Sequence, residues 1–360
     1  MKALRKYRFD PEYAVAPGET LRETMEALDM SQRELASRTG LTVQTLNRIF
    51  RGEQPISYET ANRLELATNV PARMWNNLEA EYREQLAKIE ERERLKDDME
   101  WLRIIPAKEL LDRGEIDPQE DKVLLLRETL GYYGVSSVPA WHELWDQPKV
   151  AARRSACFET RPGPASAWIR MGERQALKRK CADFDKNAFL TALETIRGLT
   201  AKEPQVFEPE MKRLCAEAGV AVALVREMKK VPWNGATKWL SPRKAMVLLS
   251  LRGKGEDKFW FSFFHEAGHV LNDNKKDLLI ADGSKTDPRE VRADKFAADF
   301  LIPAEHNDRI RNARSETALK RIARELGIAP GIVAGRYQFL TERWNYHKNL
   351  IRTLRWNGEE

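Results

Sequence analysis

The chain has 360 residues, which exceeds what one hydrophobic core usually organises and predicts two or three domains. Its hydrophobic content of 42% suffices for packed cores, and no apolar run approaches the roughly 20 residues that a membrane-spanning helix needs. The first residues carry no secretion signal, and the three cysteines match neither a disulfide framework nor a paired-cysteine metal site. We therefore expect a cytoplasmic protein, and the net charge of +6 favours a polyanionic partner.

Residues 18–80 predict five short helices separated by clear stop signals. Side chains that can cap a helix N-terminus precede three of them: Ser31, Thr42 and Ser57. Gly40 and Gly52 end two of them. The apolar spacing predicts an inward face made of Leu21, Met25, Leu28, Val43, Leu46 and Ile49.

The segment 41–52 has the features of a recognition helix, which in a helix-turn-helix enters the major groove of DNA. Between Ser31 and Gly52 the chain carries four arginines and a single acid, so the local face is basic. The residues expected to contact bases or phosphates are Gln32, Thr42, Gln44, Thr45, Asn47, Arg48 and Arg51. Half-site reading predicts a homodimer on double-stranded DNA. A small protein-binding domain of the same shape is the alternative.

The charged segment 81–100 lacks Gly and Pro and predicts an exposed helix, after which the chain is mainly helical to about residue 200. Two apolar segments, 220–225 and 244–251, then predict strands. We expect the strand at 244–251 to form a sheet edge along which an extended peptide can add. Residues 259–272 are apolar on nearly every side and predict a buried helix. Residues 315–337 read as helix, Gly turn and helix, and we expect them to pack against this C-terminal core.

The sequence HEAGH at residues 265–269 lies inside the predicted buried helix. Residues four apart share one face of a helix, so His265 and His269 can bind one metal ion. Glu266 lies beside them and can act as a base on a water molecule. A chain with only five histidines rarely places two at this spacing by chance, so the motif predicts a metal-dependent hydrolase.

A third metal ligand is expected on a downstream helix that begins at Asp287 and runs to about residue 300. Glu290 is the predicted ligand, and Asp294, four residues later, is predicted to accept a hydrogen bond from a ligating imidazole. Alternatively, Glu290 completes a capping box with Asp287. Other acids and a histidine in expected loops are weaker candidates: Asp277, Asp282, Glu305 and His306. Two imidazoles and one carboxylate suit Zn²⁺ best, with Mn²⁺ or iron also compatible.

Two family resemblances follow from these residues. Residues 18–80 resemble the XRE-type helix-turn-helix of HigA-family antitoxins, through the run from Met30 to Thr68 and the following segment VPARMWNNLEAEY. Residues 205–340 resemble the ImmA/IrrE family of metallo-endopeptidases, through the segments FWFSFFHEAGHVL and EVRADKFAADFLIP. The second resemblance implies a gluzincin-like site with His265, His269 and Glu290 as metal ligands and Glu266 as the catalytic residue. Arg292-Ala293-Asp294 stands where that family often has Glu-Ala-Asn, so which acid binds the metal stays open.

The resulting fold prediction is α+β and mostly α, with a five-helix helix-turn-helix, a helical middle region and a metallopeptidase with a small sheet. The predicted domains are a tail (1–17), the DNA-binding domain (18–80), a charged helical linker (81–116), a middle region of unknown role (117–204), the zinc peptidase domain (205–345) and a tail (346–360).

Two functions are compatible with this organisation. The first is a DNA-binding regulator whose zinc peptidase cleaves a regulatory protein, such as a repressor or a toxin-antitoxin component. The second is a HigA-like antitoxin and autorepressor that binds a RelE-like toxin, with the metal domain acting as a sensor or a binding surface. The first is an enzyme and the second a binding module.

Overall fold

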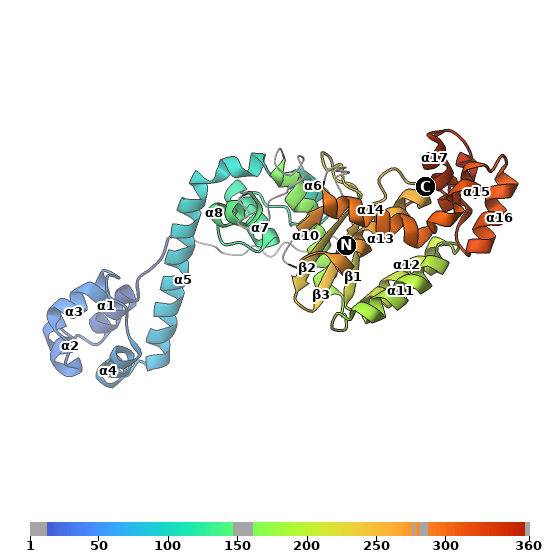
Figure 1. Cartoon of the computed structure of the whole chain (residues 1–360). Coiled ribbons are helices and arrows are strands. Elements are labelled where there is room, and N and C mark those ends of the chain that lie inside the picture. Colours follow the sequence, from blue (N-terminus) through green and yellow to red (C-terminus); the bar gives the residue numbers. More distant parts are fainter. Residues whose placement is uncertain (1–12, 147–160, 276–277, 281–286, 357–360) are drawn as a thin grey trace, which may run out of the picture. The chain divides into compact units, whose positions relative to one another are not determined.

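A computed structural model describes residues 13–146, 161–275, 278–280 and 287–356. The described chain divides into two compact units (Figure 1). The first comprises the residues up to Met99 together with 121–126, and the second comprises 100–120 and the residues from Arg127 onward. No helix within the described residues combines the length and the apolar character needed to cross a bilayer.

The N-terminal part of the first unit is a bundle of five helices, as predicted. The helices are α1 (Pro17–Ala27), α2 (Gln32–Thr39), α3 (Val43–Phe50), α4 (Tyr58–Thr68) and α5 (Ala72–Asp97). The side chains of Ser31, Thr42 and Ser57 each accept a hydrogen bond from the backbone N–H three residues later, so all three predicted caps are confirmed. Gly40 ends α2 in the left-handed conformation with φ of 69°.

The inward face of this bundle differs from the prediction at two positions. Leu21 and Leu46 are fully buried, but Leu28 is 47% exposed and Val43 is 40% exposed. Leu28 follows the last residue of α1, where the helical periodicity no longer applies. Val43 is the first residue of α3, and the buried face of that helix begins at Leu46.

Helix α5 continues without a break from the bundle into the charged segment that was expected to be a linker (Figure 1). The next elements are short helices, three longer ones and a π-helical turn. They are η1 (Met99–Arg103), α6 (Ala107–Asp112), α7 (Lys122–Tyr133), α8 (Val138–Trp141), η2 (His142–Asp146), α10 (Pro162–Lys178) and α11 (Lys186–Leu199).

A four-stranded sheet with the order β1-β3-β2-β4 lies in the second unit and follows α12 (Pro204–Glu217). The strands are β1 (Val220–Leu224), β2 (Gly235–Ser241), β3 (Lys244–Leu249) and β4 (Leu278–Ile280). Strand β3 pairs with β1 in parallel and with β2 in antiparallel orientation, so both of its sides are hydrogen-bonded. The expectation that β3 forms the sheet edge is therefore wrong. Strands β2 and β4 were not predicted.

Helices cover both faces of the sheet. On one face, Lys238 of β2 binds Glu173 of α10 at 2.5 Å. On the other face, Val247 of β3 packs into the large hydrophobic core of the second unit. Helix α13 (Glu256–Asn272) supplies most of the aromatic side chains of this core. The chain then continues through helices α14 (Pro288–Leu301), η3 (Ala304–His306), α15 (Asn307–Arg311), α16 (Glu316–Leu326), α17 (Pro330–Thr341) and η4 (Lys348–Leu350).

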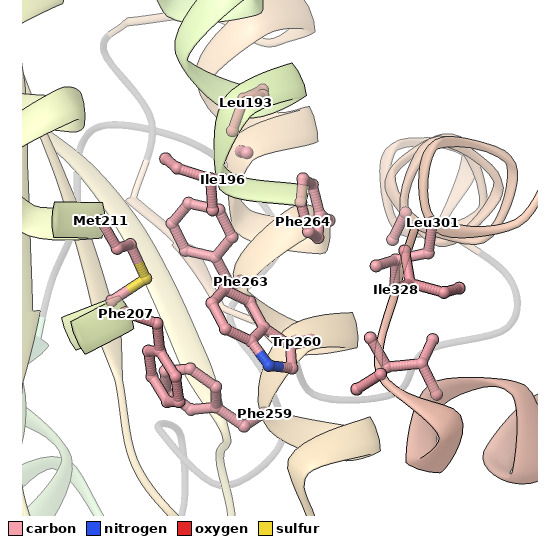
Figure 2. Packing of buried hydrophobic residues seen from close by; sticks show 14 of the residues in the cluster. Leu193, Ile196, Phe207, Met211, Phe259, Trp260, Phe263, Phe264, Leu301 and Ile328 are labelled. Atoms are coloured by element: carbon pink, nitrogen blue, oxygen red, sulfur yellow. The ribbon is translucent and has the colours of Figure 1, made fainter. Parts of the chain in front are cut away.

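The core around α13 is rich in aromatic side chains. Figure 2 shows Phe259, Trp260 and Phe263 of α13 on the side of Phe207 of α12, whereas Phe264 lies on the other side of the helix. The ring of Phe264 stacks on Phe300 of α14 with a centroid distance of 5.1 Å. Edge-on contacts between such rings add to the free energy gained from burying them. The core also contains buried residues of α16 and α17, which confirms that 315–337 pack against it. Helix α13 is therefore held on several sides.

Arg197 of α11 ties the ends of two later helices to this core. Its guanidinium donates to the carbonyl oxygens of Phe300 at 2.9 Å and Leu301 at 3.1 Å, at the end of α14. It also donates to the carbonyl of Leu326, the last residue of α16, at 2.9 Å. These carbonyls have no partner inside their own helices, so one side chain supplies a C-terminal cap to both.

We expect Arg197→Ala to lower the free energy of unfolding by about 2–4 kcal/mol, because three carbonyls lose charge-assisted hydrogen bonds. The exposed Arg321 of α16 is the matched control. Arg321→Ala should change the free energy of unfolding by less than about 0.5 kcal/mol. Urea unfolding of the full chain measures both values. Equal effects of the two substitutions would contradict the capping role.

Candidate metal centre and nucleic-acid interface

The middle of α13 carries the HEAGH sequence in a fully buried stretch of helix. His265 and His269 lie one turn apart, and their Nε2 atoms are 3.0 Å from each other. Helix α14 crosses α13 closely at this point. A Cβ built on Gly268 of α13 would lie only 3.4 Å from Cα of Ala293 of α14. This close crossing brings the side chains of α14 up to the two imidazoles.

Glu290 of α14 completes a group of three buried donors. One of its carboxylate oxygens lies 3.2 Å from Nε2 of His265, and the other lies 3.2 Å from Nε2 of His269. Ligands about 2.0–2.1 Å from a tetrahedrally coordinated Zn²⁺ are separated by roughly 3.3 Å. Nitrogen and carboxylate donors at 3.0–3.2 Å therefore fit a divalent cation of this kind.

The outer nitrogen of each imidazole faces a carboxylate. Nδ1 of His265 lies 2.8 Å from Asp294, at the position expected from the sequence. Nδ1 of His269 lies 2.7 Å from Asp273, a residue that the sequence analysis missed. Arg292 of α14 in turn donates to the other oxygen of Asp273. The signal for Asp273 was present, because it follows His269 by the same four residues that separate the two histidines.

The charges in this group are strongly coupled. Burial alone would lower the pKa of His265, but hydrogen bonds to Asp294 and Glu290 raise it to about 10. Burial likewise opposes the charged form of His269, while Asp273 and Glu290 raise its pKa to about 9. Burial acts to raise the pKa of Glu290, yet its contacts with both imidazoles bring it to about 2. The site thus favours positive charge between its carboxylates.

Glu266 is 0% exposed and lies next to the three donors without belonging to them. Its Oε2 accepts a hydrogen bond of 2.6 Å from the hydroxyl of Thr237 on β2. Burial raises the pKa of the Glu266 carboxyl, and the neighbouring imidazoles act in the opposite direction. The sequence analysis missed Thr237 because it did not predict β2.

The weaker ligand candidates from the sequence do not join the group of three donors among the described residues. Glu305 and His306 lie on η3, pair with each other at 3.7 Å and are not part of the group of three donors. Asp277 and Asp282 lie outside the described residues. Asp287 caps α14 by accepting from the backbone N–H of Arg289 at 2.9 Å.

The predicted DNA-reading residues gather on the exposed side of α3 and the start of α2. Gln44, Asn47 and Arg48 are exposed. Gln32 donates to the side chain of Asn47 at 2.8 Å, which links α2 to α3. Arg51 lies 3.8 Å from Glu53, so part of its charge is balanced within the protein.

Thr42 and Thr45, also predicted to contact DNA, form the N-terminal cap of α3. The hydroxyl of Thr42 accepts from the backbone N–H of Thr45 at 3.0 Å, and the two hydroxyls lie 2.9 Å apart. Both residues therefore help to fix the N-terminus of α3. The N-terminal residues of a recognition helix are the ones that contact base edges.

These features define a helix-turn-helix joined to a domain of the metallopeptidase type. Residues 21–75 match the model of the helix-turn-helix family, and residues 221–337 match that of the IrrE N-terminal-like domain. The chain therefore combines an XRE-type helix-turn-helix with an IrrE/ImmA-like domain, as the sequence resemblance implied. A comparison with curated proteins gave no match.

If Asp273 orients His269, Asp273→Asn should weaken Zn²⁺ binding by about 10–100-fold, because carboxylate partners of ligating histidines have effects of this size. Glu305→Gln is the control, since Glu305 is an exposed acid of the same domain outside the donor group. Competition with a chromogenic chelator measures the affinity. An unchanged affinity in Asp273→Asn would show that His269 does not need this partner.

Proposed function

We propose that the chain is a DNA-binding transcriptional regulator whose C-terminal domain is a zinc-dependent endopeptidase. Its substrate is a regulatory protein, such as a repressor or a toxin-antitoxin component. The observation that carries the proposal is the convergence of His265, His269 and Glu290 within 4.8 Å, with Glu266 on the same buried helix.

In this proposal His265, His269 and Glu290 hold Zn²⁺, while Asp294 and Asp273 orient the imidazoles. When bound, the ion supplies Lewis acidity that activates water and polarises a peptide carbonyl. Glu266 takes the proton from the attacking water and then delivers it to the leaving amine. The raised pKa that burial gives Glu266 suits a residue that must both accept and release a proton.

The same proposal assigns the helix-turn-helix to operator binding. Helix α3 enters the major groove, with Gln44, Thr45 and Asn47 near base edges and Arg48 and Arg51 at phosphates. Gln32 and Thr42 lie at the adjoining helix starts and contact the backbone of the DNA. Two copies of the chain read two half-sites as a homodimer.

Replacing Glu266 by Gln tests the enzymatic part. We expect Glu266→Gln to retain stoichiometric Zn²⁺ but to lose cleavage, because the metal ligands remain while the base is removed. Mass spectrometry of proteins from cells with the wild-type chain, Glu266→Gln or the control Glu305→Gln reports both the substrate and the loss. Metal analysis of the three purified chains shows that the site is intact.

The alternative function predicts a different outcome of that experiment. A HigA-like antitoxin that uses its metal domain only for sensing or binding would give the same protein profile with wild-type and Glu266→Gln chains. Absence of stoichiometric metal from carefully prepared wild-type protein would also count against the peptidase.

A substitution in α3 tests the DNA-binding part. Arg48→Ala should weaken operator binding and reduce the slope of log K against log salt by about 1, because one phosphate contact is lost. Lys88→Ala removes the same charge from the distal part of α5, where Lys88 pairs with Glu84 at 2.6 Å, and should leave the slope unchanged. Fluorescence anisotropy at several salt concentrations measures both slopes. Equal slopes for wild type and Arg48→Ala would exclude the phosphate contact.

A further inference from the structure

Strand β2 lies against the side of α13 that carries Glu266. Successive residues of a strand point to opposite faces of the sheet. Lys238 points toward α10, where it binds Glu173, whereas Gly235 and Thr237 face α13. Two positions of one strand therefore meet the same carboxylate.

Thr237 holds one oxygen of that carboxylate. Thr237 is only 1% exposed. Its Oγ1 lies 2.6 Å from Oε2 of Glu266 and 3.1 Å from the backbone oxygen of Glu266. A threonine hydroxyl has one proton to donate, and the shorter contact is the one to the carboxylate oxygen. The branched Thr side chain is stiff about χ1, so the hydroxyl is a well-placed donor.

Gly235 leaves room for the rest of the Glu266 side chain. A Cβ at this position would lie 2.5 Å from Oε1 and 2.8 Å from Cγ of Glu266, so any larger residue forces the glutamate to move. Oε1 is buried and has no hydrogen-bond partner among the described residues. Leaving a buried carboxylate oxygen unpaired is costly, and such an oxygen in a native protein calls for a functional explanation.

We propose that Gly235 and Thr237 are positioning residues for Glu266, with Thr237 anchoring Oε2 and Gly235 keeping Oε1 free for the proton of the attacking water. This inference rests on the proposed peptidase function. It makes β2 part of the catalytic apparatus through the contacts of both positions with Glu266. Holding a base in one rotamer removes conformations that cannot transfer the proton.

Thr237→Val and Thr237→Ser separate the hydroxyl from the shape of the side chain. The substrate is a fluorogenic peptide that spans a cleavage site found in the comparison of wild-type and Glu266→Gln cells. We expect Thr237→Val to lower kcat by about 10–100-fold with KM and Zn²⁺ content unchanged, since a misplaced catalytic group costs up to this much. Thr237→Ser, which keeps the donor, should recover kcat to within about threefold of wild type.

Gly235→Ala tests the space beside Oε1. It should lower kcat at least as much as Thr237→Val, because the added methyl group displaces the carboxylate itself. The control is Gly198→Ala in α11, where a Cβ would meet no atom within 4 Å, and it should leave kcat unchanged. Full activity of Gly235→Ala would overturn the role of Gly235.

A measurement on the metal-free protein gives a readout that does not depend on activity. Thr237→Val should lower the urea midpoint of the Glu266 chain more than that of a Glu266→Met chain, in which the acceptor is missing. Equal shifts in the two backgrounds would show that the hydroxyl does not hold Glu266 and would overturn the inference.

The outcomes separate the two proposals. If wild type cleaves, Glu266→Gln does not, and Thr237→Val retains full kcat, the peptidase assignment stands and the inference about β2 fails. If wild type cleaves no protein, the peptidase assignment fails. The urea comparison then decides alone whether β2 holds the Glu266 carboxylate.

Discussion

The close crossing of α13 and α14 is the constraint on which the metal centre depends. Gly268 allows the backbone of α14 to approach at Ala293: a Cβ at this position would already lie 3.4 Å from Cα of Ala293 and 3.1 Å from the Phe296 ring, which leaves no room for a side chain larger than a methyl group. At this separation the carboxylate of Glu290 reaches both imidazoles at 3.2 Å. Because the aromatic core packs around α13, the histidines cannot shift to compensate for a displaced α14.

The parts of the site that the sequence predicted are those set by local helical geometry. His265 and His269 share a face because they are four residues apart, and Glu290 and Asp294 repeat that spacing on the next helix. The order of strands in the sheet could not be predicted in this way, because it depends on pairing between segments that are distant in the sequence. The expected edge strand β3 lies inside the sheet, and β2, which holds Glu266, has the mixed sequence GATKWLS that carries no clear strand pattern.

The helix-turn-helix illustrates the same division on a smaller scale. Its caps could be predicted because Ser31, Thr42 and Ser57 act on backbone groups only three residues away. The exposure of Leu28 and Val43 could not be predicted from periodicity, since both lie at helix ends where burial depends on neighbouring helices. Capping patterns are therefore more informative here than apolar spacing near a terminus.

The charges at the centre explain why a divalent cation fits. Glu290, Asp273 and Asp294 surround the two imidazoles, and they raise the pKa of His265 to about 10 and that of His269 to about 9. The carboxylates thus favour positive charge at the two imidazoles. Metal ligation needs neutral imidazoles, so a bound metal ion would compete with protons for the same nitrogen atoms. A divalent cation would supply positive charge at the place where the carboxylates favour it.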